Sequence, residues 1–105
     1  MSIQERARAF EAKFGQNQDM MFKANMRRNR KIGHWAGNLL GHEGEKLDTY
    51  IDSVIDSDFE EAGDADIIKK LMGDFEQAGI EMRTHRIETE LAHFLQEAMA
   101  ELAGE

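Results

Sequence analysis

The chain has 105 residues, of which 41% are hydrophobic and 32% charged, and this length corresponds to a single domain. It contains no cysteine, which excludes disulfides, thiolate catalysis and cysteine-based zinc sites. The N-terminus lacks the apolar stretch of a signal peptide, and no apolar run approaches the roughly 20 residues of a membrane span. We therefore expect a soluble, cytoplasmic protein without direct membrane insertion.

The net charge of −8 is divided unevenly along the chain. Residues 1–40 contain eight Lys/Arg and three Asp/Glu, whereas residues 41–105 contain five and eighteen. The sequence therefore predicts a cationic N-terminal part joined to an acidic body. Because phosphate contacts dominate nucleic-acid affinity, the acidic body argues against a nucleic-acid partner.

Residues 1–18 are predicted to form a mobile N-terminal segment. Apolar residues follow one helical face, at Ile3, Ala7, Phe10 and Phe14. Cations lie on the other faces, at Arg6, Arg8 and Lys13. Because a lone helix this short is marginal in water, we expect disorder in the free chain and a helix once a partner groove accepts Phe10 and Phe14. The alternative is that both phenylalanines fold back on the core of the same chain.

Residues 19–105 are predicted to form an all-α four-helix bundle. Short turns with Gly or Asp join four segments with apolar residues at helical spacing, at about residues 20–40, 45–60, 64–78 and 84–102. The second segment has the most regular apolar stripe, which runs from Leu47 to Phe59. No segment alternates with a period of two, so we expect no strands.

Gly33 and Gly37 lie in the interior of the first of these predicted helices. Each lowers helix stability by about 1 kcal/mol relative to alanine. Because they lie four residues apart, they share a face of the helix. We expect this face to let a neighbouring helix approach closely.

Arg27, Arg28, Arg30 and Lys31 place four cations within five positions of one predicted helix. Like charges at this spacing repel one another, so the cluster needs partners. In one interpretation, some of these side chains pair with the acidic second and third of the predicted helices. In the other, Arg27, Arg28 and Lys31 bind an anion such as a nucleotide phosphate, and Trp35 stacks against the ligand.

The sequence shows no catalytic or metal-binding motif. The acidic run at residues 56–60 lacks the glycine and glutamate that a calcium loop needs at its sixth and twelfth positions. The glycines between residues 37 and 44 lack the Walker spacing, and the four histidines lack metal-ligand spacing. We therefore predict a protein that is not an enzyme and that requires no cofactor or metal.

Four sequence blocks carry a family resemblance. They are residues 8–14 (RAFEAKF), 22–29 (FKANMRRN), 33–36 (GHWA) and 58–64 (DFEEAGD). Taken together, in order along the chain, they resemble the zeta inhibitor subunit of α-proteobacterial F-type ATP synthases, a family formerly known as a domain of unknown function.

The resemblance implies a four-helix bundle preceded by a mobile inhibitory segment. In this family the segment is thought to insert at a catalytic α/β interface beside the rotor and to block ATP hydrolysis. The implied partner is the catalytic head of the synthase, with its α, β and γ subunits, which would also hold this otherwise monomeric protein near the inner membrane. The residues that would contact this partner are Ile3, Arg6, Arg8, Phe10, Lys13 and Phe14.

The resemblance also implies a regulatory ligand, because some family members bind ATP or ADP. Arg27, Arg28, Lys31 and Trp35 are the residues that we predict to bind a nucleotide, on chemical grounds alone. The alternative function is accordingly an ATP/ADP-responsive binding module with weak or no inhibitory activity.

Overall fold

The computed structural model describes residues 2–58 and 63–105, and this part of the chain contains helices and turns but no strand. Its five helices are α1 (Ile3–Phe14), α2 (Gln18–Leu39), α3 (Gly44–Asp56), α4 (Ala65–Gln77) and α5 (Thr84–Ala103). The all-α prediction is confirmed. Helix α3 ends at Asp56, and the predicted core residue Phe59 lies outside the described residues. Among the helices of the described residues, none has the length and apolarity needed to cross a membrane.

The N-terminal segment forms a fifth helix, which corrects the prediction of a four-helix bundle with a flexible leading segment. Ser2 caps α1, because its Oγ accepts a hydrogen bond from the backbone N–H of Glu5 at 3.1 Å. Ala7 and Phe10 are fully buried, and α1 packs mainly against α5. This apolar contact supplies the stabilisation that an isolated 12-residue helix lacks in water. The alternative, in which the segment folds back on its own chain, describes the structure.

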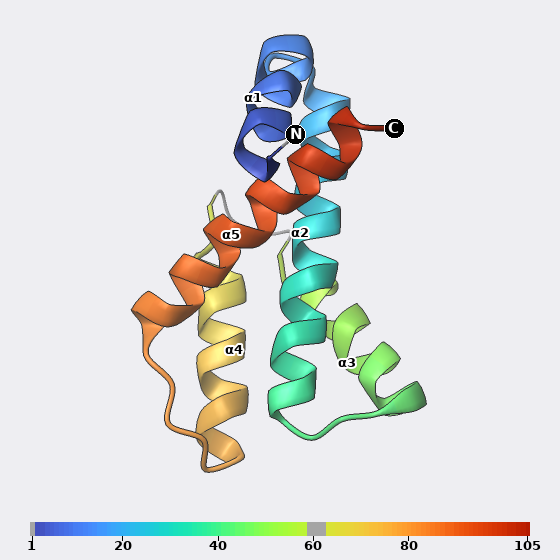
Figure 1. Cartoon of the computed structure of the whole chain (residues 1–105). Helices are drawn as coiled ribbons and strands as arrows, with labels where there is room; N and C mark the ends of the chain where they lie inside the picture. The colour runs from blue at the N-terminus through green and yellow to red at the C-terminus, as the bar shows by residue number, and fades with distance from the viewer. Residues whose placement is uncertain (1, 59–62) are drawn as a thin grey trace.

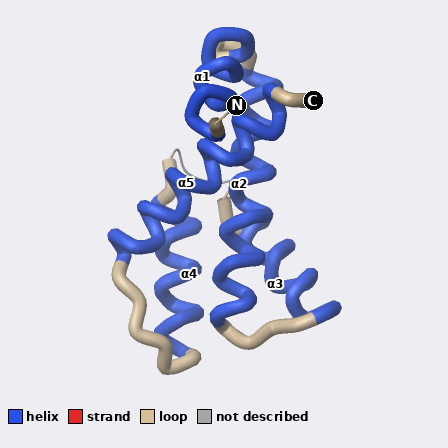
Figure 2. The backbone as a smooth tube through the Cα atoms, viewed as in Figure 1, coloured by secondary structure: helices blue, strands red, loops and turns tan. Residues whose placement is uncertain are grey.

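Helices α2 and α5, with 22 and 20 residues, are the longest and pack against each other (Figure 1). Helix α1 lies at one end of this pair, and α3 and α4 lie at the other end (Figure 1). Figure 2 shows the same division, with both chain termini at the α1 end. The molecule measures 42 × 28 × 26 Å and is therefore elongated.

The core consists of two hydrophobic clusters. The larger cluster joins α2, α3, α4 and α5 through Ile32, Ala36, Val54, Ile67, Leu71, Phe75, Ile87 and Leu91. In the smaller cluster, Ala7 and Phe10 of α1 pack against a surface that we call the α1 seat, formed by Ala24, Met99 and Leu102. The two clusters share no buried residue, so α1 contributes to the smaller cluster and not to the larger one.

Helices α2 and α3 approach each other closely at the two interior glycines of α2. A Cβ atom at Gly33 would lie 3.2 Å from the Cα of Ile51 and 3.3 Å from the Cβ of Val54. Neither atom can rotate away, because one is backbone and the other is bonded directly to it. Gly37 lies in the same way against the side chain of Leu47. The prediction that these glycines admit a neighbouring helix is confirmed.

Gly33→Ala is expected to leave the protein about 1–2 kcal/mol less stable than Gly73→Ala. Both changes gain about 1 kcal/mol of helix propensity, and a Cβ at Gly73 in α4 would meet no atom within 4 Å. The difference between the two variants therefore isolates the crowding between α2 and α3. Chemical denaturation measures it, and equal free energies of unfolding would show that α3 moves aside without loss.

Candidate functional site

The first candidate site is α1, docked on its seat. Phe10 is fully buried, and the centroid of its ring lies 5.3 Å from that of Phe14 with the ring planes tilted by 59°. The Nζ atom of Lys13 lies 5.1 Å from the centre of the Phe14 ring. Ile3, Arg8 and Lys13 are exposed. The two predicted aromatic anchors are therefore together, whereas these three partner-binding candidates face solvent.

Apolar contacts hold α1 in place. In residues 2–58 and 63–105, no ion pair or side-chain hydrogen bond joins α1 to another helix. The guanidinium of Arg6 lies against Gly104 at the C-terminal end of α5, where the helix dipole favours a cation by about 0.3–1 kcal/mol. Burial of Phe10 contributes about 1.5–3 kcal/mol. Together, Phe10 and Arg6 therefore contribute about 2–4 kcal/mol to holding α1 on its seat.

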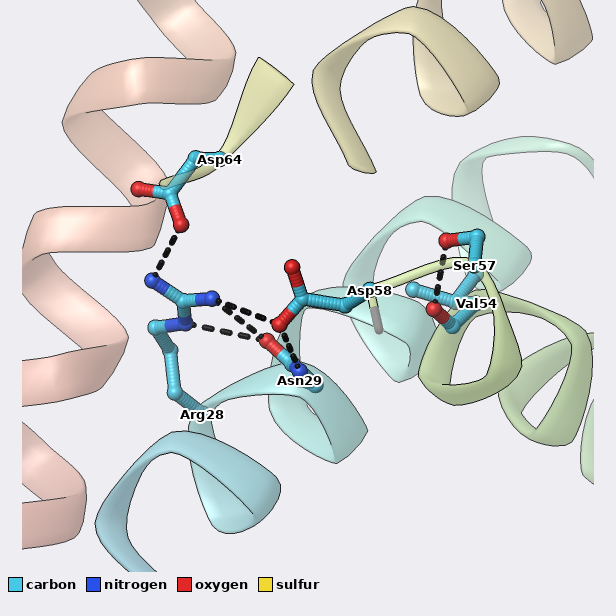
Figure 3. A network of polar contacts seen from close by, with 6 residues as sticks. All are labelled: Arg28, Asn29, Val54, Ser57, Asp58 and Asp64. Atoms are coloured by element: carbon cyan, nitrogen blue, oxygen red, sulfur yellow. Dashed lines mark hydrogen bonds and ion pairs between the residues drawn. The ribbon is translucent and has the colours of Figure 1, made fainter. Parts of the chain in front are cut away.

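The second candidate site is the cation cluster of α2, in which Arg28 is buried (Figure 3). Its side chain is 6% exposed and donates hydrogen bonds to Asp64 Oδ1 at 2.8 Å and to Asp58 Oδ2 at 3.3 Å. It also donates to Asn29 Oδ1, and Asn29 Nδ2 donates to Asp58 Oδ2 at 2.6 Å. Figure 3 shows the guanidinium between the two carboxylates. This Arg28 network ties α2 to the segments that follow α3 and precede α4.

Arg27 and Lys31 point toward α5. Lys31 Nζ lies 2.7 Å from Glu97 and 2.8 Å from Glu101. Arg27 lies 3.3 Å from Glu101 and 2.9 Å from Glu105. These ion pairs, which we call the α2–α5 ladder, follow the same end of α5 that carries the α1 seat.

Burial destabilises the charged forms of the ladder residues, but the hydrogen bonds between these residues stabilise the charged forms by more. Burial favours a lower pKa for Lys31, yet its hydrogen bonds to Glu101 and Glu97 raise that pKa above its ordinary value. Burial favours a higher pKa for Glu101, yet hydrogen bonds from Lys31 and Arg27 lower it. Both groups therefore stay charged at neutral pH. An anion that binds Lys31 must first displace a carboxylate.

Trp35 packs against the larger hydrophobic cluster. Its ring makes an edge contact with Phe75, with 6.0 Å between centroids and 73° between planes, and the Cζ of Arg86 lies 5.7 Å from its centre. The structure does not bring the four predicted nucleotide-binding residues to one place: Arg28 faces α3 and α4, Arg27 and Lys31 face α5, and Trp35 faces the core. The expected pairing with the second and third predicted helices describes Arg28, whereas Arg27 and Lys31 pair instead with glutamates of α5 and its C-terminal end. Nucleotide binding stays a prediction.

A family match spans both candidate sites. The model of the family described as ATPase inhibitor subunit zeta matches residues 1–101. The chain belongs to this family. Members of an inhibitor-subunit family are regulatory proteins rather than enzymes, and membership implies an association with ATP synthase. No curated protein matches the sequence.

The sequence of this zeta-family chain indicates only some of the residues that form the two candidate sites. The sequence does not single out Met99 of α5 or Ala24 of α2 as residues of the α1 seat. Met99 and Leu102 widen the apolar surface of α5 near its C-terminus, and a wider apolar surface indicates a second neighbouring helix. Asn29 is a polar residue within the apolar stripe of α2. In the sequence, this is the feature that indicates a buried polar network, which Asn29 forms with Arg28.

Proposed function

We propose that this chain inhibits ATP hydrolysis by the F-type ATP synthase and that α1 is the inhibitory segment. In this mechanism α1 leaves its seat and inserts, as a helix, at a catalytic α/β interface beside γ. The observation that carries the proposal is the separation of the α1 seat from the larger hydrophobic cluster. Because of this separation, departure of α1 exposes its seat but leaves the larger cluster of α2–α5 covered.

Released α1 has the chemistry of a helix that binds a groove. Phe10 and Phe14 lie four residues apart on one face, Arg6 borders that face, and Arg8 and Lys13 are exposed on the others. Amphipathic helices bind hydrophobic grooves through anchors at this spacing, and surrounding cations add complementarity to an acidic rim. Phe10 therefore has two competing positions, one on its own seat and one in the groove of the partner.

The rest of the molecule is suited to remain folded while α1 moves. Only Gly15, Gln16 and Asn17 separate α1 from α2. Asn17 caps α2, because its Oδ1 accepts a hydrogen bond from the backbone N–H of Met20 at 3.2 Å. Helix α2 thus keeps its own cap, and the Arg28 network and the α2–α5 ladder connect it to the other helices.

Titration of the chain into purified F-type ATPase from the same organism tests the proposal. Hydrolysis is expected to fall with increasing chain concentration and to reach a plateau when the ATPase is saturated. An acidic helical protein of similar size and net charge is the control for nonspecific effects. Unchanged hydrolysis at concentrations well above that of the enzyme would rule out the proposed function.

A further inference from the structure

An exposed aromatic residue stands on the N-terminal half of α2. Phe22 is 66% exposed, more than the other exposed large hydrophobic residues of the described chain, Ile3 and Leu39, which are 45% and 48% exposed. Met26 follows one turn later on the same face and is half-buried. Together Phe22 and Met26 form an apolar ridge, which we call the α2 ridge. The smaller and larger hydrophobic clusters both leave Phe22 out.

A groove of ≈ 510 Å³ borders the α2 ridge. Phe14 and Leu102 line the side of the groove formed by α1 and α5, and Phe22 and Met26 line the side formed by α2. The groove is therefore continuous from the docked inhibitory helix to the exposed ridge. Phe14 leaves with α1 in the proposed mechanism, so the apolar side chains that stay are Phe22, Met26 and Leu102, and a surface of this kind can take up a hydrophobic side chain of a partner.

Cations without ion-pair partners flank the α2 ridge. Lys23 and Arg30 line the same groove and are exposed, and neither forms an ion pair within residues 2–58 and 63–105. Their neighbours Arg27 and Lys31 are, by contrast, each paired with two glutamates, on α5 or just beyond its C-terminal end. In a chain with a net charge of −8, an unneutralised cationic rim around an apolar centre favours an acidic partner surface.

The chain itself brings the α2 ridge to the partner of α1, so this inference rests on the proposed function. Phe22 follows Phe14 by eight residues, which span at most about 28 Å when fully extended. When Phe14 binds in the catalytic interface, the ridge must lie within that distance of it. We infer that the α2 ridge, with Lys23 and Arg30, is a second docking surface for an acidic, apolar-centred patch of the ATPase next to the α1 groove.

Two pairs of variants of the full-length chain test this docking surface. Phe22→Ser removes the apolar anchor, and Leu39→Ser removes an exposed apolar side chain from the opposite end of α2 as its matched control. Both side chains are largely solvent-exposed, so circular dichroism should show the same helix content in both variants and in the wild-type chain. Inhibition of ATP hydrolysis and direct binding to the ATPase are measured for each.

The second pair concerns charge. The double variant Lys23→Glu, Arg30→Glu reverses the rim of the ridge. Its control, Lys46→Glu with Lys69→Glu, makes the same change in charge at two exposed lysines of α3 and α4. The net charge of the two double variants is identical, so a difference between them reports the location of the charges rather than general repulsion.

The ridge variants are expected to raise the half-inhibitory concentration by about tenfold or more, as for loss of an interface anchor. They should still reach full inhibition, because α1 is unchanged. The control variants should stay within about twofold of the wild-type chain. Ridge variants that match their controls, while the wild-type chain inhibits, would overturn the docking surface and leave the proposed function intact.

Two other outcomes also decide the assignment. If the wild-type chain neither binds nor inhibits the ATPase, the proposed function fails and the docking surface fails with it. If the ridge variants instead abolish self-association of the free chain in analytical ultracentrifugation, a second copy occupies the ridge, and its assignment to the ATPase is wrong.

Discussion

Phe10→Asp is expected to abolish inhibition of ATP hydrolysis without unfolding α2–α5. Aspartate places a charge where an apolar groove must take a phenyl ring, and an unpaired buried charge is strongly unfavourable. The fold should survive because Phe10 belongs to the smaller cluster only. Hydrolysis assays measure the inhibitory potency. Circular dichroism measures the helix content, which should fall by no more than the contribution of α1.

Because Phe10→Asp also releases α1 from its seat, a second variant must separate release from binding. Met99→Ala weakens the seat from the α5 side and leaves the sequence of α1 unchanged. A buried methionine contributes about 2–5 kcal/mol relative to alanine, a range comparable to the contribution of Phe10 and Arg6 to docking of α1. Met99→Ala is therefore expected to raise the population of released α1 and to lower the half-inhibitory concentration.

The comparison between the two variants gives a clear result. If Phe10 anchors the partner, Phe10→Asp loses inhibition and Met99→Ala keeps or improves it. Equal potency of Phe10→Asp and the wild-type chain would exclude Phe10 as an anchor. A parallel loss of inhibition in both variants would show instead that docked α1 is the active form.

Arg28→Ala is expected to destabilise the fold by about 3 kcal/mol or more, because removal of one member of a buried ion pair leaves the other without compensation. The orphaned groups are Asp58, which is 14% exposed in its side chain, and Asn29, which is buried. For a domain of about this size, the loss corresponds to a fall of more than about 10 °C in the melting temperature. Thermal denaturation followed by circular dichroism measures it.

Arg30→Ala is the matched control for Arg28→Ala. Arg30 lies on the same helix but is exposed, so its replacement should change stability by no more than about 0.5 kcal/mol. If both variants proved equally stable, the Arg28 network would not hold the fold together. Arg28 would then be better explained as a ligand-binding residue.

The helices of this fold can be predicted from the sequence, but the position of α1 cannot. Burial repeats at helical spacing in α2, α4 and α5, so their apolar stripes are visible in the chain. The stripe of α1 is equally visible. Periodicity shows that Phe10 and Phe14 need an apolar surface, and it does not show whether the chain or a partner provides it.

The charge cluster of α2 illustrates a second limit. Successive residues of a helix point about 100° apart, so Arg27 and Lys31 share a face that Arg28 does not. That spacing is enough to predict that Arg28 has different partners from Arg27 and Lys31. It does not identify Asp58 and Asp64, because both are about 30 or more residues away from Arg28 in the sequence and reach it only through the packing of α3 and α4.

The movement of α1 can be followed by a distance between two labels. The chain has no cysteine, so Ala12→Cys on α1 and Gln96→Cys on α5, both at exposed positions, would carry spin labels without background. The doubly labelled chain must first be shown to inhibit the ATPase. Pulsed electron–electron double resonance should then give one short distance in the free chain and a distinctly longer one in the inhibited complex. An inhibited complex that keeps the distance of the free chain would contradict the release of α1.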